Sequence, residues 1–122
     1  MSVVLTVRYQ ESSRIFVGAY SGVVDIHQIR EGLEQCYALP DPVRVIWDLQ
    51  EAEVGYGLEE VSQLGRQMMP SIKHPGSMAF VYGEKMFIKA VVESVRETRQ
   101  VWQQTWELFE NVEDAETWLL SR

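Results

Sequence analysis

Hydrophobic and polar positions alternate at the start of the chain. From Val3 to Tyr9 every second residue is apolar, while Thr6 and Arg8 lie between, which is the period of a strand with one buried face. After a short polar stretch, Arg14–Tyr20 has the apolar centre of a second strand, which Ser21 and Gly22 end. These segments predict an opening hairpin.

From Asp25 the period becomes helical. Asp25 is a typical N-cap, Gln28 stands where a capping box needs a glutamine, and Pro40 and Pro42 end the helix. One face of the predicted helix is apolar. Its residues are Ile26, Ile29, Leu33, Cys36 and Tyr37.

The middle of the chain alternates strands with helices. Val43–Leu49 is apolar with little alternation, which indicates a strand buried on both faces, and the acidic Gln50–Gly57 is predicted to be a loop. Two helices, over Leu58–Ile72 and Glu84–Arg99, flank a short apolar strand at Ser77–Tyr82. For the second of these helices we predict an inner face of Met86, Phe87, Ala90, Val91, Ser94 and Val95.

The chain closes with a strand at Thr105–Phe109 and a helix that Asn111 caps, with Ala115, Trp118 and Leu119 inward. The order is therefore β-β-α-β-α-β-α-β-α. A hairpin followed by regular alternation predicts an α/β fold, with a mixed, mostly parallel sheet of about five strands and four helices. At 122 residues we expect residues 1–122 to form a single domain.

Charge and cysteine content exclude several classes of protein. Eighteen acidic residues against 11 basic ones give a net charge of -7, which disfavours binding to nucleic acid or to anionic membrane. No apolar run approaches the ~20 residues of a membrane span, so we expect no stable membrane insertion. Cys36 is the only cysteine, and no signal peptide opens the sequence, so a reducing, cytoplasmic location is expected.

Three features carry a family resemblance: Gly18 after the second strand, the strand ending Val45–Leu49, and the closing Asn111–Leu119. With this element order they resemble the STAS domain, the fold of bacterial anti-sigma-factor antagonists. The likeness is greater to the STAS-like branch related to lipid-binding CRAL-TRIO domains. The resemblance implies a bacterial regulatory domain that is not an enzyme and that binds a protein partner or forms a homodimer.

The chain departs from that family at one functional position. Antagonist STAS domains carry a phosphorylatable serine or threonine where the helix after the central strand starts. Here Asp48–Leu58 contains neither residue, and the first serine or threonine after it is Ser62. A phosphorylation switch at this position is therefore not expected, and whether another residue is phosphorylated stays open.

Two sets of residues are candidate sites. The partner-binding set is the acidic segment after the central strand together with two aromatic residues: Asp48, Glu51, Glu53, Tyr56 and Trp102. The alternatives are a solvated acidic loop, with Asp48 capping the turn after it, and a Trp102 folded over the sheet edge. The second set would bind a small apolar, lipid-like ligand, unless it is ordinary core or a dimer contact. It comprises Met68, Met69, Phe80, Met86 and Phe87.

Nothing in the sequence has the pattern of a catalytic, cofactor or metal site. His27 and His74 are far apart, Cys36 lies on the inner face of its helix as a buried thiol would, and no glycine-rich phosphate loop is present. The one basic cluster is explained by pairing along a helix, as between Lys89 and Glu93. Its members are Lys85, Lys89, Arg96 and Arg99.

Overall fold

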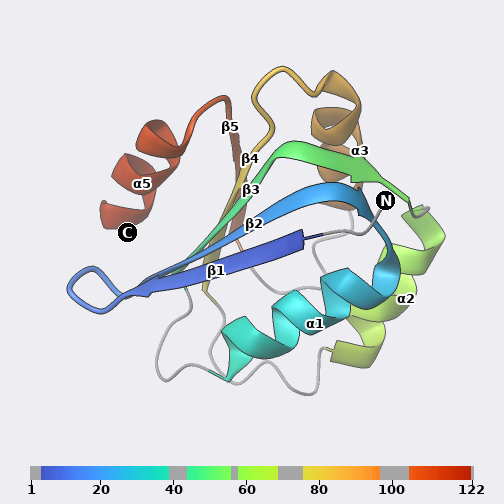
Figure 1. Cartoon of the computed structure of the whole chain (residues 1–122), viewed down its shortest axis with the longest axis horizontal. Coiled ribbons are helices and arrows are strands. Elements are labelled where there is room, and N and C mark those ends of the chain that lie inside the picture. The colour runs from blue at the N-terminus through green and yellow to red at the C-terminus, as the bar shows by residue number, and fades with distance from the viewer. Residues whose placement is uncertain (1–3, 39–43, 56–57, 69–75, 97–104, 122) are drawn as a thin grey trace.

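A computed structural model describes residues 4–38, 44–55, 58–68, 76–96 and 105–121 (Figure 1). It shows a five-stranded sheet of order β1-β2-β3-β4-β5, in which β1 and β2 are antiparallel and the later neighbours are parallel. The α/β class and the mixed sheet are confirmed. The strands are β1 (Val4–Gln10), β2 (Ile15–Val24), β3 (Arg44–Val54), β4 (Ser77–Val81) and β5 (Thr105–Phe109). The helices are α1 (Ile26–Tyr37), α2 (Leu58–Met68), α3 (Met86–Arg96) and α5 (Val112–Leu120).

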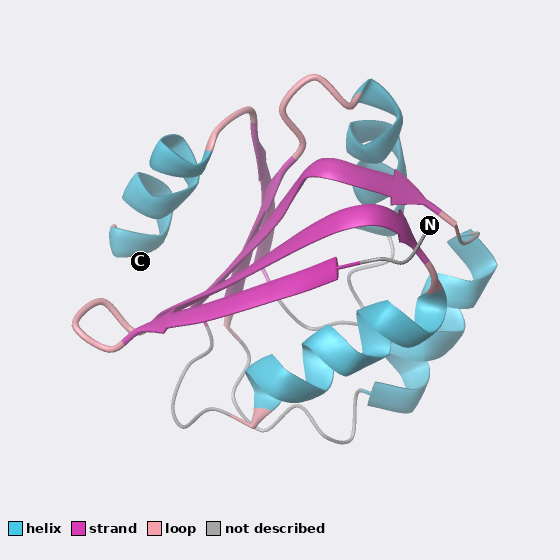
Figure 2. Cartoon of the chain, in the orientation of Figure 1, coloured by secondary structure: helices cyan, strands magenta, loops and turns pink. Residues whose placement is uncertain are grey.

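The helices lie on both faces of the sheet. Because β2 to β5 follow one another in order and in parallel, right-handed connections place α1, α2 and α3 on the same face. Helix α5 comes after the last strand and packs on the other face (Figures 1 and 2). The helix-side core includes Phe16, Tyr20, Leu33, Val45, Trp47, Met78, Phe80, Ile88 and Val92. The α5-side core is Ile15, Val17, Ile46, Ala79, Val81, Ala115 and Leu119.

Trp47 is the largest side chain at the centre of the helix-side core. Its ring lies 5.7 Å from that of Phe16 and stacks on Tyr20 at 5.9 Å between centroids. Two glycines leave room for it: a Cβ on Gly18 would lie 2.7 Å from Trp47 Cε3, and one on Gly32 would lie 3.1 Å from Cη2. Gly18 thus lets the Trp47 ring lie directly against the backbone of β2.

The predicted helix caps are present. The Asp25 carboxylate accepts from the backbone N–H groups of His27 (2.9 Å) and Gln28 (3.0 Å), and the Gln28 side chain accepts from the Asp25 N–H, completing the capping box. The side-chain oxygen of Asn111 accepts from the Asp114 N–H at 2.8 Å and so caps α5. These local signals place both helix starts correctly.

Strands β2 and β3 are longer than the sequence indicated, and the prediction of a loop from Gln50 was wrong. The two strands remain paired to Val24 and Val54, although β4 ends opposite Asp48. Each strand supplies the other's hydrogen bonds, so polar side chains do not end the pairing. A register shift between Ala19 and Ser21 inserts one extra residue into β3, which is a β-bulge.

The predicted inner face of α3 was also wrong. Ile88 and Val92 are buried and Val91 is half-buried, whereas Met86, Phe87, Ala90 and Ser94 are exposed. Ile88, Val91 and Val92 follow the spacing of one helix face, i, i+3 and i+4, and their packing sets the rotation of the helix. The side chain of Val95 lies outside the described residues.

Candidate functional site

The paired ends of β2 and β3 project beyond β4 as a two-stranded ribbon, which we call the acidic ribbon (Ser21–Val24 and Glu51–Val54). Its end lies on the side of the molecule away from α5 (Figure 1). Ala52 is buried in the helix-side core, so Glu51 and Glu53 point to the opposite face, and both are exposed. Two of the predicted partner-binding carboxylates therefore lie together in solvent.

Asp48 has a different role. It is half-buried, and its Oδ1 accepts from the backbone N–H of Gln50 at 3.2 Å and from the Gln50 side-chain amide at 3.1 Å. These bonds hold the chain where the bulge falls. The turn that Asp48 was expected to cap is not formed, because β3 continues to Val54. Its carboxylate is engaged within the protein, unlike those of Glu51 and Glu53.

The turn between β4 and α3 rests on the base of the acidic ribbon. Gly83 has a positive φ of 60°, and a Cβ there would lie 2.9 Å from Gln50 Cγ. The turn is closed by the Lys85 N–H, which donates to the Tyr82 carbonyl at 2.9 Å. Because this turn leads directly into Met86, the start of α3 is fixed beside the ribbon.

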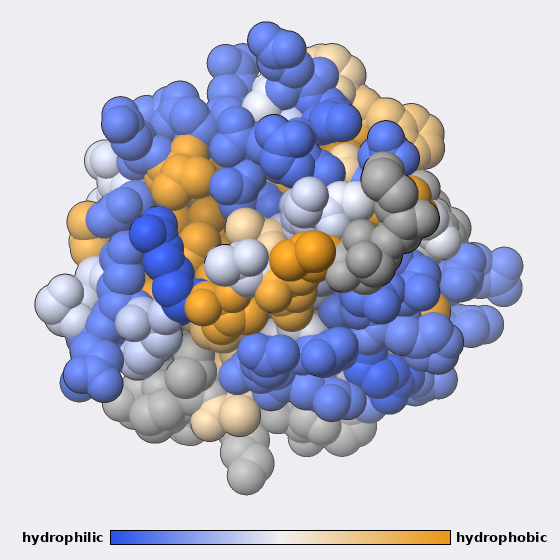
Figure 3. All heavy atoms as spheres, viewed as in Figure 1, coloured by the Kyte–Doolittle hydropathy of each residue, from blue (hydrophilic) through white to orange (hydrophobic). Residues whose placement is uncertain are grey.

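The outer side of α3 is an apolar ridge, which we call the α3 ridge (Met86, Phe87, Ala90 and Ser94). Met86 is 61% exposed and Phe87 is 69% exposed, although they are large hydrophobic side chains. Figure 3 shows hydrophobic surface over the start of this helix. The sequence marked Met86 and Phe87 as candidate apolar-ligand residues but placed them on the inner face of the helix, which Ile88 occupies instead.

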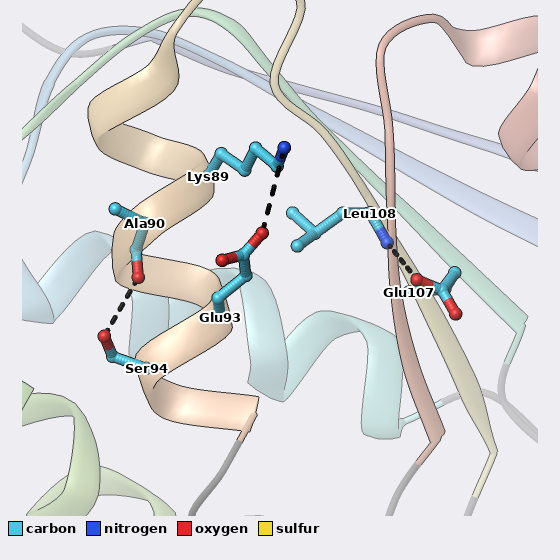
Figure 4. Close-up of polar contacts among 6 residues, drawn as sticks. All are labelled: Lys89, Ala90, Glu93, Ser94, Glu107 and Leu108. Atoms are coloured by element: carbon cyan, nitrogen blue, oxygen red, sulfur yellow. Dashed lines mark hydrogen bonds and ion pairs between the residues drawn. The ribbon is translucent and has the colours of Figure 1, made fainter.

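The charged residues of α3 flank the ridge. Lys89 and Glu93, one helical turn apart, form an ion pair at 4.0 Å (Figure 4). The Lys89 ammonium lies 5.5 Å from the centre of the Tyr82 ring. The ion pair confirms the helix-face pairing that the sequence indicated. Ser94 donates to the carbonyl of Ala90 at 3.0 Å. With their polar groups engaged in this way, the ridge itself offers apolar contact.

The candidate apolar-ligand residues do not share one environment. Phe80 is buried in the helix-side core, with its ring centre 4.8 Å from that of Trp106, whereas Met86 and Phe87 are exposed on α3. Trp106 packs against the helix-side core. Tyr56, Met69, His74 and Trp102 and the side chain of Met68 lie outside the described residues.

At the carboxyl edge of the sheet, Glu51 and Glu53 extend into solvent. In the described part of the chain, no group of three His, Cys, Asp or Glu residues could hold a metal ion. His27 is exposed on α1. Over the same residues, no helix is long and apolar enough to cross a membrane.

Cys36 is a core residue. Its side chain is 0% exposed and its thiol donates to the Leu33 carbonyl at 3.3 Å. Burial raises the pKa of the Cys36 thiol to about 12, since the thiolate would lose its hydration. The thiol therefore stays protonated near neutral pH and is not a nucleophile in the folded protein.

Solved structures with the same architecture identify the fold. An uncharacterised protein of the DUF3478 family with a SpoIIAA-like fold, from Shewanella loihica PV-4, is 18% identical with a TM-score of 0.60, over 96% of this chain and 93% of that one. An anti-sigma factor antagonist from Mycobacterium paratuberculosis is 15% identical with a TM-score of 0.58, over 97% and 94%. No protein-family model and no curated protein matches the sequence.

The chain thus has the SpoIIAA-like fold, the STAS fold of anti-sigma factor antagonists. This confirms the resemblance drawn from the element order. Neither neighbour is described as a CRAL-TRIO or lipid-binding protein, so the link to that branch has no support from them. At this level of identity the likeness concerns the fold alone.

Proposed function

We propose that this protein is a non-enzymatic regulatory domain that binds a protein partner through the carboxyl edge of its sheet. The observation that carries the proposal is the exposure of Met86 and Phe87, 61% and 69%, side by side on the first turn of α3. Two large apolar side chains held on a rigid helix are typical anchors of a protein interface.

The acidic ribbon supplies the second half of the surface. Glu51 and Glu53 lie on the strand whose bulge touches the turn before α3, through the contact between Gln50 and Gly83. A partner with an apolar groove bordered by lysine or arginine would complement both parts, and its basic residues would speed association. Tyr56 and Trp102 remain predicted contacts of this surface.

One structural neighbour supports such a role. The protein from Mycobacterium paratuberculosis is an anti-sigma factor antagonist, a regulator named for its effect on another protein. Here the start of α2 carries Glu59 and Glu60 in its first turn, and Asp48–Leu58 contains no serine or threonine. Binding by this chain would therefore not be switched by phosphorylation at the usual position of the family.

The test compares variants of the α3 ridge and of α5. Partners captured by the wild type from its source cells are identified, purified and titrated against Met86→Ser/Phe87→Ser. Loss of two anchors is expected to weaken binding by about 100-fold or more. The matched control is Leu120→Ser, because Leu120 is 54% exposed on α5, and it should bind as the wild type does. Equal affinity of the ridge variant and the control would overturn the proposal.

A further inference from the structure

Among the residues that the structure describes, strand β1 is an open edge of the sheet. It pairs with β2 on one side only, over seven consecutive residues from Val4 to Gln10, with no bulge, glycine or proline. The N–H and C=O groups of alternate residues on its outer side are therefore available to another strand. Val4 is 55% exposed and Val7 is 37% exposed. Figure 3 shows a strip of hydrophobic surface along this edge, between α5 and α1.

The opposite edge of the sheet is strand β5, where the side chain of Glu107 occupies an outward-facing backbone N–H. On β5, the Thr105 N–H donates to Gly76 and the Phe109 carbonyl accepts from Tyr82, so the N–H of Leu108 points away from β4. The Glu107 carboxylate accepts that N–H at 3.2 Å and places a negative charge on the edge (Figure 4). Charged side chains at an edge prevent further strand pairing. Strand β1 has a single charged residue, Arg8.

The charge of β1 also differs from that of the whole molecule. The chain has 18 acidic residues and a net charge of -7, yet Val4–Gln10 contains no acid and one base. Two copies of this protein repel each other over most of their surface, because like charges meet. Strand β1 adds no carboxylate to that repulsion, so this edge is the more favourable place for a second copy to approach.

The residues of β1 are complementary to themselves. In an antiparallel pair with its twofold axis at Val7, Leu5 would face Tyr9 of the second copy and Thr6 would face Arg8. Leu5, Val7 and Tyr9 share the helix side of the sheet, since their partners in β2 are Tyr20, Gly18 and Phe16. The pairing would therefore join two aliphatic–aromatic pairs around a Val7–Val7 contact, and no like charges would lie directly opposite.

We propose that this protein forms a homodimer in which two β1 strands pair antiparallel about Val7 and join two sheets into one. The occupant of the edge is a second copy of the chain. A single strand pair is a small interface, so the dimer is expected to dissociate at about micromolar concentration. The α3 ridge lies on another element and is left free.

The test is the molar mass in solution, measured by sedimentation velocity over about 1–200 µM. The wild type should change from monomer to dimer over that range, whereas Val7→Lys and Val7→Glu should each stay monomeric, because like charges would meet on the axis. An equimolar mixture of these two variants should recover the dimer, since lysine then faces glutamate. That recovery also shows that both variants are folded.

Two controls separate this proposal from the one on partner binding. Thr105→Lys, an exposed position on the β5 edge, and the ridge variant Met86→Ser/Phe87→Ser should both dimerise as the wild type does. A wild type that stays monomeric at all concentrations, a dimeric Val7→Lys variant, or a mixture that fails to associate would each overturn the β1 dimer. None of these results bears on the α3 ridge.

Discussion

The packing around Trp47 shows how single residues fix the fold. The indole ring lies between the backbone of β2 at Gly18 and the backbone of α1 at Gly32, positions where any larger side chain would meet it. The Tyr20 ring stacks beside the indole. Its hydroxyl donates to the Gln28 carbonyl at 2.6 Å, which links α1 to β2. One tryptophan and two glycines thus set the distance between helix and sheet.

We expect Gly18→Ala to destabilise the protein by about 1–3 kcal/mol, because the added methyl group overlaps the Trp47 ring. The lower entropy of the unfolded chain would by itself favour alanine by about 0.4–1 kcal/mol, so the steric term decides the sign. The measurement is urea unfolding.

A double-mutant cycle with Trp47→Phe tests the cause of that loss. The smaller ring makes room for the methyl group, so Gly18→Ala should cost at least about 1 kcal/mol less in the Trp47→Phe background. Strictly additive effects would contradict the steric explanation.

At the scale of elements, local signals in the sequence were reliable and long-range ones were not. Asp25 with Gln28, and Asn111, mark helix starts through bonds to residues two or three positions away. The ends of β2 and β3 depend instead on pairing between strands about 30 residues apart. Because Glu51 and Glu53 are residues that strands disfavour, the sequence around them predicted a loop.

The same distinction explains the candidate site. The acidic residues after the central strand could be read from the sequence, but their arrangement required the bulge and the partner strand. The exposure of Met86 and Phe87 could not be predicted, because their apolar side chains fit an inner helix face as well as a binding surface. Only the packing of Ile88 and Val92 against the sheet shows which side of the helix is inward.

Helix α5 offers a clear test of element packing. Leu119 is 0% exposed in the α5-side core, whereas its neighbour Leu120 is 54% exposed. We expect Leu119→Ala to lower the free energy of unfolding by about 2–5 kcal/mol, and Leu120→Ala to change it by less than about 0.5 kcal/mol. Urea unfolding of both variants measures this, and similar losses would show that α5 does not pack as described.

For the whole molecule, the distribution of charge connects stability with binding. The net charge of -7 makes the compact state repel itself. The acidic ribbon adds a local term, because Glu51 and Glu53 are two residues apart on one strand and so point to the same face in solvent. Exposed apolar side chains lie on the α3 ridge, on the helix side of the sheet. Such costs to stability and solubility are expected where a surface serves binding.

Two double charge reversals test the role of the acidic ribbon. Glu51→Lys/Glu53→Lys and Glu11→Lys/Glu31→Lys both change the net charge from -7 to -3, and all four residues are exposed. At low ionic strength both variants should unfold at higher urea concentration than the wild type, and the ribbon variant should gain more, by about a few tenths of a kcal/mol, because it also removes a local repulsion. About 0.5 M salt should remove these differences.

Only the ribbon variant should associate more slowly with the partner that the α3 ridge binds, because only there do the carboxylates face it. If the two variants bind that partner equally fast, Glu51 and Glu53 are a solvated strand surface and the ridge acts without them.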